Sequence, residues 1–177
     1  YSDLYRYTGN RKGLVKKYFL IPGFHYTCLM RFVKYFSCHK KYFLFKVLFQ
    51  LRLRHYMFKF GIQIPYQTQI GKGFYIGHFG DIVISPDSII GNNVNISQGV
   101  TIGKANRGTN KGAAIIGNEV YIGPGAKIVG KVMIGNNVAI GANAVVTHDI
   151  PDNATVGGVP AKIISMKGTE GYINRKI

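Results

Sequence analysis

The sequence predicts a mainly β protein, a parallel β-helix preceded by a small α-helical region. Two observations lead to this prediction. From Ile64 to Val146, aliphatic residues recur six positions apart in successive runs and are often followed by glycine. From residue 11 to 60, by contrast, apolar residues follow helical spacing and glycine is rare. A period of six fits neither an α-helix nor an ordinary sandwich, whereas it fits coils made of three short strands.

Residues 1–60 are expected to form a basic, aromatic helical domain. Twelve basic residues and no acidic one lie between residues 11 and 60, interleaved with Phe, Tyr, Leu and Val. The spacing of the apolar residues predicts two or three helices, and the Pro22-Gly23 pair marks the turn before the first clear one.

Residues 61–162 are expected to form the β-helix, with about four coils of eighteen residues. The aliphatic residues point inward, and Gly or Asn takes the left-handed backbone conformation at the corners. The step from Ile102 to Ile116 is fourteen residues rather than twelve. A protruding, mobile and basic loop is therefore expected at residues 104–114, and residues 163–177 are expected to be a short C-terminal tail.

The charge of the chain limits its partners. Lys and Arg number 23 against 7 Asp and Glu, which gives a formal net charge of +16 at pH 7. An anionic partner is expected, and an active site of paired carboxylates is not. The most apolar segment, residues 42–60, carries several basic side chains, so no membrane span is expected. No export signal is expected at the N-terminus either.

The two cysteines, Cys28 and Cys38, lack the clustered spacing of a zinc site or a disulfide framework. They are predicted to be reduced thiols in a cytoplasmic protein.

Three interpretations of the basic segment 11–60 stay open. It packs and assembles the protein, or it lies peripherally on an anionic membrane such as the inner face of the cell membrane. Nucleic-acid binding is disfavoured because no recognised module accompanies the charge.

Four motifs stand in order between about residue 20 and residue 165. They are Pro22-Gly23-Phe24-His25, Gly77-His78-Phe79-Gly80, Ile96-Ser97-Gln98-Gly99-Val100-Thr101-Ile102-Gly103 and Gly157-Gly158-Val159-Pro160-Ala161-Lys162. Together with the six-residue repeat, they resemble the serine acetyltransferase family of hexapeptide-repeat acyltransferases. The resemblance implies a left-handed β-helix and acetyl-CoA as co-substrate without a metal. It also implies a homotrimer with CoA between neighbouring chains, and it leaves open whether two trimers pair.

The resemblance also implies the site residues. His78 matches the catalytic histidine, and Gln63 occupies the position of the Asp that orients it. Members that acetylate serine have an Asp before the histidine and an Arg-His pair in the loop, and these positions are Gly77, Gly112 and Ala113 here. Free serine needs a cation and an anion placed to match its charges. We therefore predict an uncharged acceptor, a sugar hydroxyl of a cell-surface polysaccharide. Serine O-acetylation is the alternative, and a non-catalytic structural β-helix module is an alternative of another class.

The expected mechanism is direct transfer, in which His78 takes the proton of the acceptor hydroxyl as that oxygen attacks the thioester. For Gln63, orientation of the His78 ring and a merely surface role both stay open. CoA contacts are expected where the resemblance places small or basic residues, namely Gly103, Lys104, Gly123, Pro124, Gly141, Ala142, Pro160 and Lys162. A zinc hydratase on the same fold is disfavoured because the β-helix offers two histidines, His78 and His148, where three are needed. His148 is expected to be structural.

Overall fold

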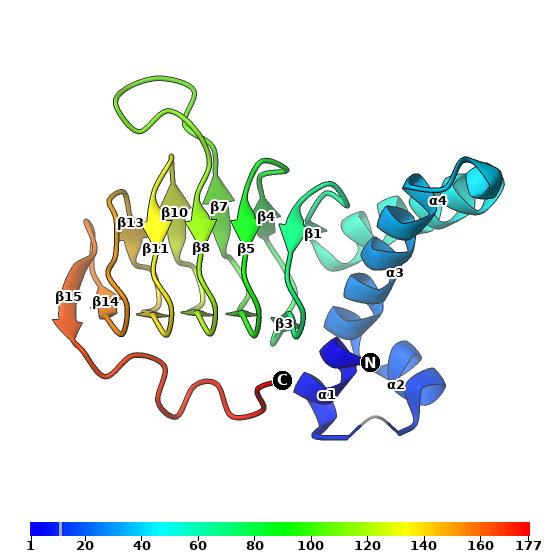
Figure 1. Cartoon of the computed structure of the whole chain (residues 1–177), viewed down its shortest axis with the longest axis horizontal. Helices are drawn as coiled ribbons and strands as arrows, with labels where there is room; N and C mark the ends of the chain where they lie inside the picture. Colours follow the sequence, from blue (N-terminus) through cyan, green and yellow to red (C-terminus); the bar gives the residue numbers. More distant parts are fainter. Residues whose placement is uncertain (11) are drawn as a thin grey trace.

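The computed structural model describes residues 1–10 and 12–177, so Arg11, the first residue of the basic segment, lies outside the described residues. Helices at one end of the molecule are followed by a row of short strands (Figure 1). The helices are α1 (Ser2–Thr8), α2 (Leu14–Leu20), α3 (Pro22–Ser37), the 3-10 helix η1 (Lys40–Tyr42) and α4 (Phe43–Phe60). Residues 12–60 thus contain three α-helices, where the sequence predicted two or three, and α1 precedes this segment.

Local sequence explains where the long helices begin and end. Pro22 is the first residue of α3, a position where its missing N–H would have no helical partner. Gly61 ends α4 with a φ of 62°, the left-handed conformation that glycine adopts at little cost. The Tyr26 hydroxyl donates to the carbonyl of Ile64 at 3.0 Å and accepts from the amide of Ile64 at 3.2 Å, so α3 is fixed to the first coil.

The strands form three sheets, which we call A, B and C. Sheet A has the order β1-β4-β7-β10-β13, sheet B the order β11-β8-β5-β2, and sheet C the order β15-β14-β12-β9-β6-β3. Their bounds are β1 (Ile62–Gln63), β2 (Gln69–Ile70), β3 (Tyr75–Ile76), β4 (Ile82–Ile84), β5 (Ile89–Ile90), β6 (Asn95–Ile96), β7 (Thr101–Gly103), β8 (Ile115–Ile116), β9 (Tyr121–Ile122), β10 (Lys127–Val129), β11 (Met133–Ile134), β12 (Ala139–Ile140), β13 (Val145–Val146), β14 (Thr155–Gly157) and β15 (Lys162–Ser165).

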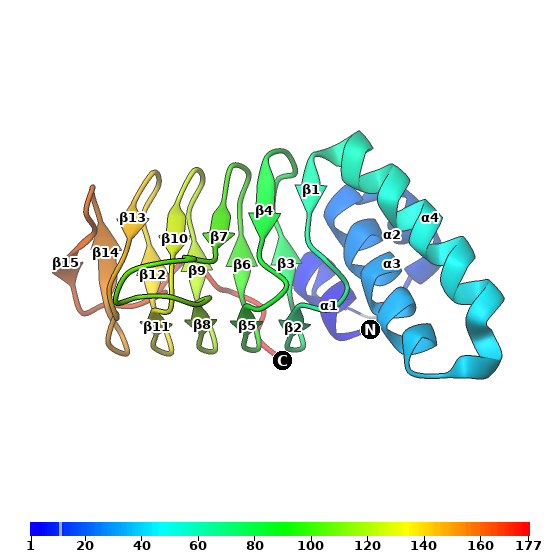
Figure 2. The same ribbon diagram turned by 90° about the horizontal axis from the view of Figure 1, so that it is seen from above.

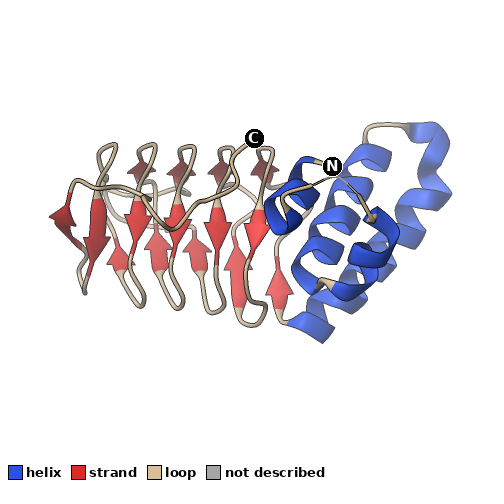
Figure 3. Cartoon of the chain, turned by 90° about the horizontal axis from the view of Figure 1, so that it is seen from below, coloured by secondary structure: helices blue, strands red, loops and turns tan. Residues whose placement is uncertain are grey.

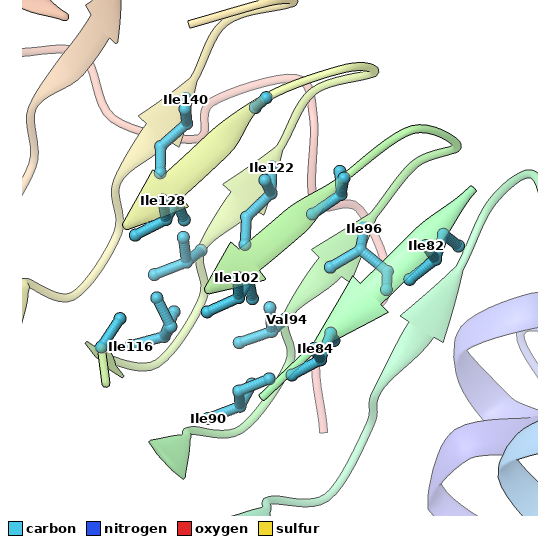
Figure 4. Close-up of a cluster of buried hydrophobic side chains, with 14 of the residues drawn as sticks. Ile82, Ile84, Ile90, Val94, Ile96, Ile102, Ile116, Ile122, Ile128 and Ile140 are labelled. Atoms are coloured by element: carbon cyan, nitrogen blue, oxygen red, sulfur yellow. The ribbon is translucent and has the colours of Figure 1, made fainter. Parts of the chain in front are cut away.

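Each coil visits sheets A, B and C in turn, and the pairing between coils is parallel, for example Ile84 with Ile102 and Ile96 with Ile122. Figure 4 shows the aliphatic side chains of successive coils stacked inside the prism. Ile82, Ile102 and Ile122 are fully buried. The period of six therefore arises because each strand and its corner use six residues, and the predicted left-handed β-helix is confirmed.

The glycines that follow the aliphatic residues have a different role from the one predicted. Gly91 and Gly117 do not have a positive φ. A Cβ atom built on Gly91 would lie 2.5 Å from the carbonyl oxygen of Gly117, and one on Gly117 would lie 2.7 Å from that of Gly135. Left-handed conformations fall two residues later, at positions such as Asn93 and Asn137. The prediction was right for asparagine and wrong for these glycines, which allow neighbouring coils to approach.

A ladder of side-chain amides stabilises the corner between sheets B and C. The Oδ1 atoms of Asn92, Asn118 and Asn136 accept backbone N–H bonds at 2.8 Å from Lys72, Asn92 and Asn118 respectively. Asp152 accepts the amide of Asn136 at 2.6 Å in the same way. Each coil thus satisfies donors of the coil before it.

The C-terminal residues 166–177 run along the outside of sheet C back to the helices, and we call this segment the strap (Figures 1 and 3). Tyr172 stacks on Tyr121 with ring centroids 4.4 Å apart, and the Thr169 hydroxyl donates to Asn137 at 2.6 Å. Before the strap, β15 pairs antiparallel with β14. The sequence predicted only a short tail here, because no repeat marks it.

Arg6 connects three distant parts of the chain. Its buried guanidinium donates to the carbonyl of Gly73 at 3.2 Å, to the carbonyl of Arg175 at 2.6 Å and to the side chain of Asn95. Helix α1, the first two coils and the strap therefore share one hydrogen-bonding centre.

Candidate active site

His78 lies on the edge of the prism where each coil passes from sheet C to sheet A, which we call the C–A edge. It follows β3, where the amide of Gly77 donates to the carbonyl of Ile96 at 2.9 Å. Gly80 and Asp81, with φ values of 109° and 52°, then turn the chain into β4. The ring of His78 is exposed. Beside it, Phe79 contacts Phe60 at the end of α4, with ring centroids 5.3 Å apart.

Several of the predicted CoA contacts lie on this same edge, in later coils. Gly123 and Gly141 follow strands of sheet C as Gly77 does, donating to the carbonyls of Ile140 and Val156 at 2.8 Å. Pro124, Ala142 and Pro160 come next at the corners, so these small residues continue the edge beyond His78. Proline, alanine and glycine leave room for a ligand to approach the backbone. CoA contact at this edge stays a prediction.

Gly103 and Lys104 lie on a different edge. Gly103 ends β7 in sheet A, and Lys104 begins the loop that leads to sheet B, where its ammonium pairs with Asp87 at 2.7 Å. Sheet A therefore separates these residues from His78 within one chain. Lys162 begins β15 and is exposed at the end of the prism.

Gln63 lies in β1 and pairs with Val83 of β4 in sheet A. Its neighbours Ile62 and Ile64 are buried, so the Gln63 side chain points outward. Among residues 1–10 and 12–177, the structure shows no hydrogen bond between Gln63 and His78. Orientation of the His78 ring by Gln63 stays a prediction.

The loop after β7 protrudes from the coils, as predicted, but it is tied down at two places (Figure 1). Ala105 and Gly112 exchange backbone hydrogen bonds of 2.9 Å at its base. Further along, the Asn110 side chain donates to the carbonyl of Thr147 at 2.8 Å. The loop lies back along later coils (Figure 2), and its residues 106–111 are exposed to solvent. Its predicted mobility stays a prediction.

Two positions where the resemblance led us to expect charged residues in serine-acetylating members, Gly77 and Gly112, differ in the room they offer. Gly77 has no positive φ, and a Cβ atom there would first meet the ring edge of Tyr75 at 3.2 Å. Gly112 has a φ of 133°, and its Cβ would lie 3.0 Å from the Cβ of Lys131. A side chain at Gly112 is therefore strained in this backbone, whereas one at Gly77 needs only a small shift of a tyrosine ring.

Neither thiol is arranged for covalent catalysis. Cys28 lies in α3, and burial raises the pKa of its thiol to about 12, so the nucleophilic thiolate is scarce near neutral pH. Cys38 follows the same helix. Within the described ranges 1–10 and 12–177, no three His, Cys, Asp or Glu side chains are grouped as metal ligands.

Two residues on or near the C–A edge were not singled out from the sequence. Gln98 is exposed. It occupies the position of His78 in the next coil, because Ile76 is in register with Ile96 and each residue lies two positions further on. Lys127 lies on sheet A, and its ammonium donates to the carbonyl of Gly99 at 2.5 Å and to the Thr101 hydroxyl at 3.1 Å. The sequence could have indicated Lys127, because it directly precedes the inward-facing Ile128 and must therefore point outward from the strand.

A large cavity in the helical part of the chain does not include His78. It has a volume of about 770 Å³ and is lined mainly by apolar side chains of α2, α3 and α4, among them Val15, Phe32 and Phe49. The C–A edge, in contrast, is an open surface.

Comparison with known proteins places the chain in a family. Residues 113–148 match the model of the bacterial transferase hexapeptide (six repeats). A serine acetyltransferase from Helicobacter pylori (strain J99 / ATCC 700824) is 37% identical over 146 residues, which cover 82% of this chain and 83% of that protein.

Solved structures agree with the sequence comparison. A serine acetyltransferase in complex with CoA is 33% identical with a TM-score of 0.70, over 84% of this chain and 60% of that one. The Neisseria gonorrhoeae serine acetyltransferase in complex with serine is 28% identical with a TM-score of 0.69, over 92% of this chain and 65% of that one. This chain thus spans less than two thirds of those two structures. The predicted acyltransferase class is confirmed, and the chain belongs to the serine acetyltransferase family of hexapeptide-repeat proteins.

Proposed function

We propose that the chain is an acetyl-CoA-dependent O-acetyltransferase with His78 as general base. The observation that carries this proposal is the position of His78, exposed on the C–A edge at the start of a line of small residues. The same edge offers backbone to an extended ligand at Gly123 and Gly141. A relative of the same fold was solved in complex with CoA, which supports acetyl-CoA as the co-substrate.

The reaction needs little from the protein besides positioning and a base, because a thioester is already activated. Neutral His78 accepts the proton of the acceptor hydroxyl as the oxygen attacks the acetyl carbonyl. A tetrahedral oxyanion forms and collapses, the C–S bond breaks, and the CoA thiolate leaves and is protonated by the imidazolium. The acceptor gains the acetyl group in one displacement, and no acyl-enzyme forms.

A homotrimer is part of the proposal. His78 lies on one edge of sheet A, and Gly103, Lys104 and the loop lie on the opposite edge. If both sets contact one substrate, they come from two chains packed side by side. Each chain then supplies His78 to one site and its loop to another. Pairing of two trimers stays a further proposal, to be checked by light scattering.

The comparisons favour L-serine as the acceptor, which was the alternative in the sequence-based prediction, over a sugar. The relatives are named serine acetyltransferases, and solved structures include one in complex with serine and one in complex with cysteine. L-serine is therefore the first acceptor to test.

A specific observation keeps a sugar hydroxyl as the second candidate. Gly77, Gly112 and Ala113 supply no charge where the resemblance places groups for the ammonium and carboxylate of serine. The backbone at Gly112 also resists a side chain, because its φ is 133°. An uncharged acceptor, such as a polysaccharide hydroxyl, needs no such pair of charges.

The test is release of CoA from acetyl-CoA, followed with a thiol reagent, in the presence of L-serine or of sugars, nucleotide sugars and oligosaccharides. Turnover with L-serine alone would remove the sugar proposal, and turnover with a glycan alone would remove serine. If no acceptor gives turnover and CoA does not bind, the chain is a structural β-helix module and the proposed function is wrong.

A further inference from the structure

Helix α4 presents a continuous apolar surface to solvent, which we call the outer α4 face. Phe43 is 66% exposed, Leu44 79%, Val47 36%, Leu48 61%, Leu51 62% and Phe58 76%. Phe43, Val47 and Leu51 are four residues apart, and Leu44 and Leu48 lie one residue further on, so they share one side of the helix. Isolated exposed apolar residues are ordinary, whereas a row of six is not.

The outer α4 face is additional to the side that packs against the protein. Leu53 is buried in the core, and Phe49, Tyr56, Met57 and Phe60 pack against it. Core packing therefore accounts for one side of α4 and leaves the other exposed among the described residues 1–10 and 12–177. Figures 1 and 2 show α4 at the end of the molecule opposite β14 and β15, so neither the β-helix nor the strap covers it.

The charges around this face are all positive. Arg54 lies on the face itself, between Leu51 and Phe58, and Lys41 precedes the helix. No acidic residue occurs in the sequence between Asp3 and Asp81. Asp3 is already paired with Arg31 at 2.5 Å. The cations of α4 thus lack compensation within the helical part of the chain.

We propose that the outer α4 face binds the surface of an anionic lipid bilayer, with Phe and Leu side chains in the interface and Lys41 and Arg54 against lipid phosphates. A helix of apolar side chains bordered by Lys and Arg is the type that lies in the headgroup region. No helix of the described residues is long and apolar enough to cross a bilayer, so the contact is along the surface.

A second copy of this chain is a poorer occupant of the same face. Symmetric pairing of two α4 helices would bring cations against cations, with no carboxylate on either helix to compensate them. A bilayer that contains anionic lipid supplies both the apolar layer and the opposite charge. This proposal does not depend on the acceptor or on the acetyl transfer.

The test is sedimentation of the full chain with vesicles of phosphatidylcholine alone or with about 30% phosphatidylglycerol. We expect at least about tenfold stronger binding to the anionic vesicles, weakened by raising the salt to about 0.5 M. The variant Phe43→Ser with Leu44→Ser and Leu48→Ser should lose binding about tenfold or more. Lys41→Glu with Arg54→Glu should lose the preference for anionic lipid.

Matched controls carry the same changes elsewhere. Met133→Ser with Ile164→Ser and Met166→Ser removes side chains of similar exposure, and Lys131→Glu with Lys167→Glu removes equal charge. Both should bind vesicles like the unchanged chain, and circular dichroism should show all variants folded. Equal binding of the α4 and control variants, or no vesicle binding, overturns the proposal. Light scattering that shows the α4 variants splitting an oligomer, without vesicle binding, would assign the face to a second copy.

Discussion

Two histidines of the β-helix, His78 and His148, are both exposed, but they differ in what surrounds them. His78 lies on the C–A edge before the small residues of later coils, whereas His148 lies after β13 beyond the end of sheet A. We expect His78→Ala to reduce CoA release about 100-fold or more while CoA binding persists, because the acceptor loses its base. His148→Ala is the control and should leave turnover unchanged. Equal rates for the two variants would remove His78 from the mechanism.

His25 is a buried histidine of the helical part, and its environment makes it sensitive to pH. Its ring stacks on Tyr18 with centroids 4.1 Å apart, and Nδ1 is 3.0 Å from the carbonyl oxygen of Tyr18. Nε2 is buried and has no hydrogen-bond partner among the residues that the structure describes. Burial lowers the pKa of His25 below its ordinary value of 6.5. The unfolded chain therefore binds a proton at this histidine more readily than the folded chain does. The contribution of neutral His25 to the free energy of unfolding is fully present above pH 6.5 and is lost as the pH falls below it.

Urea unfolding at about pH 7.5 and pH 5.5 measures this effect, with a slope of at most about 1.4 kcal/mol per pH unit from one group. His25→Gln should reduce the loss at the lower pH, because glutamine keeps a donor and does not titrate. His55→Gln changes an exposed histidine and should keep the full pH dependence. An unchanged pH dependence in His25→Gln would show that other groups cause it.

At the scale of the strand and corner, the contact between coils distinguishes two glycines that look alike in the sequence. We expect Gly117→Ala to lower the free energy of unfolding by about 1–3 kcal/mol, because its Cβ would meet the backbone of the next coil. Gly103→Ala should change it by less than about 0.5 kcal/mol, since the nearest atom, on Thr101, is 3.9 Å away. Thermal or urea unfolding of both variants measures these changes. Similar losses of free energy of unfolding in the two variants would contradict the role of close contact between coils at Gly117.

The same scale shows how much the sequence could predict. The six-residue period predicted the β-helix, because the inward position of each strand must be apolar and can therefore be recognised from the residue type alone. The Asn92 ladder was missed, and the left-handed conformation was wrongly assigned to glycines such as Gly91, because both depend on which coil lies above which. The motif around His78 singled out this residue, whereas its place on the C–A edge followed only from the structure. The separation of His78 from Lys104 by sheet A followed only from the path of the chain.

For the whole molecule, Arg6 determines whether the helices, the first two coils and the strap hold together. Arg6→Met keeps apolar volume but leaves the carbonyls of Gly73 and Arg175 without their donor, and we expect a loss of about 1–3 kcal/mol. Backbone amides of the strap should exchange hydrogen faster at the same time. Lys167→Met, in the exposed part of the strap, should do neither. A stable Arg6→Met variant with a protected strap would contradict this role.

The strap also limits which sides of the molecule can contact another chain. A triangular prism has three flat sides, and three open sides would allow chains to extend sideways without limit. Residues 166–177 lie over sheet C, with Tyr172 stacked on Tyr121, so that side is already filled by the protein itself. In the proposed homotrimer, the other two sides, formed by sheets A and B, would each face one neighbour. Such a ring would close on itself and leave no third side from which a lattice could grow.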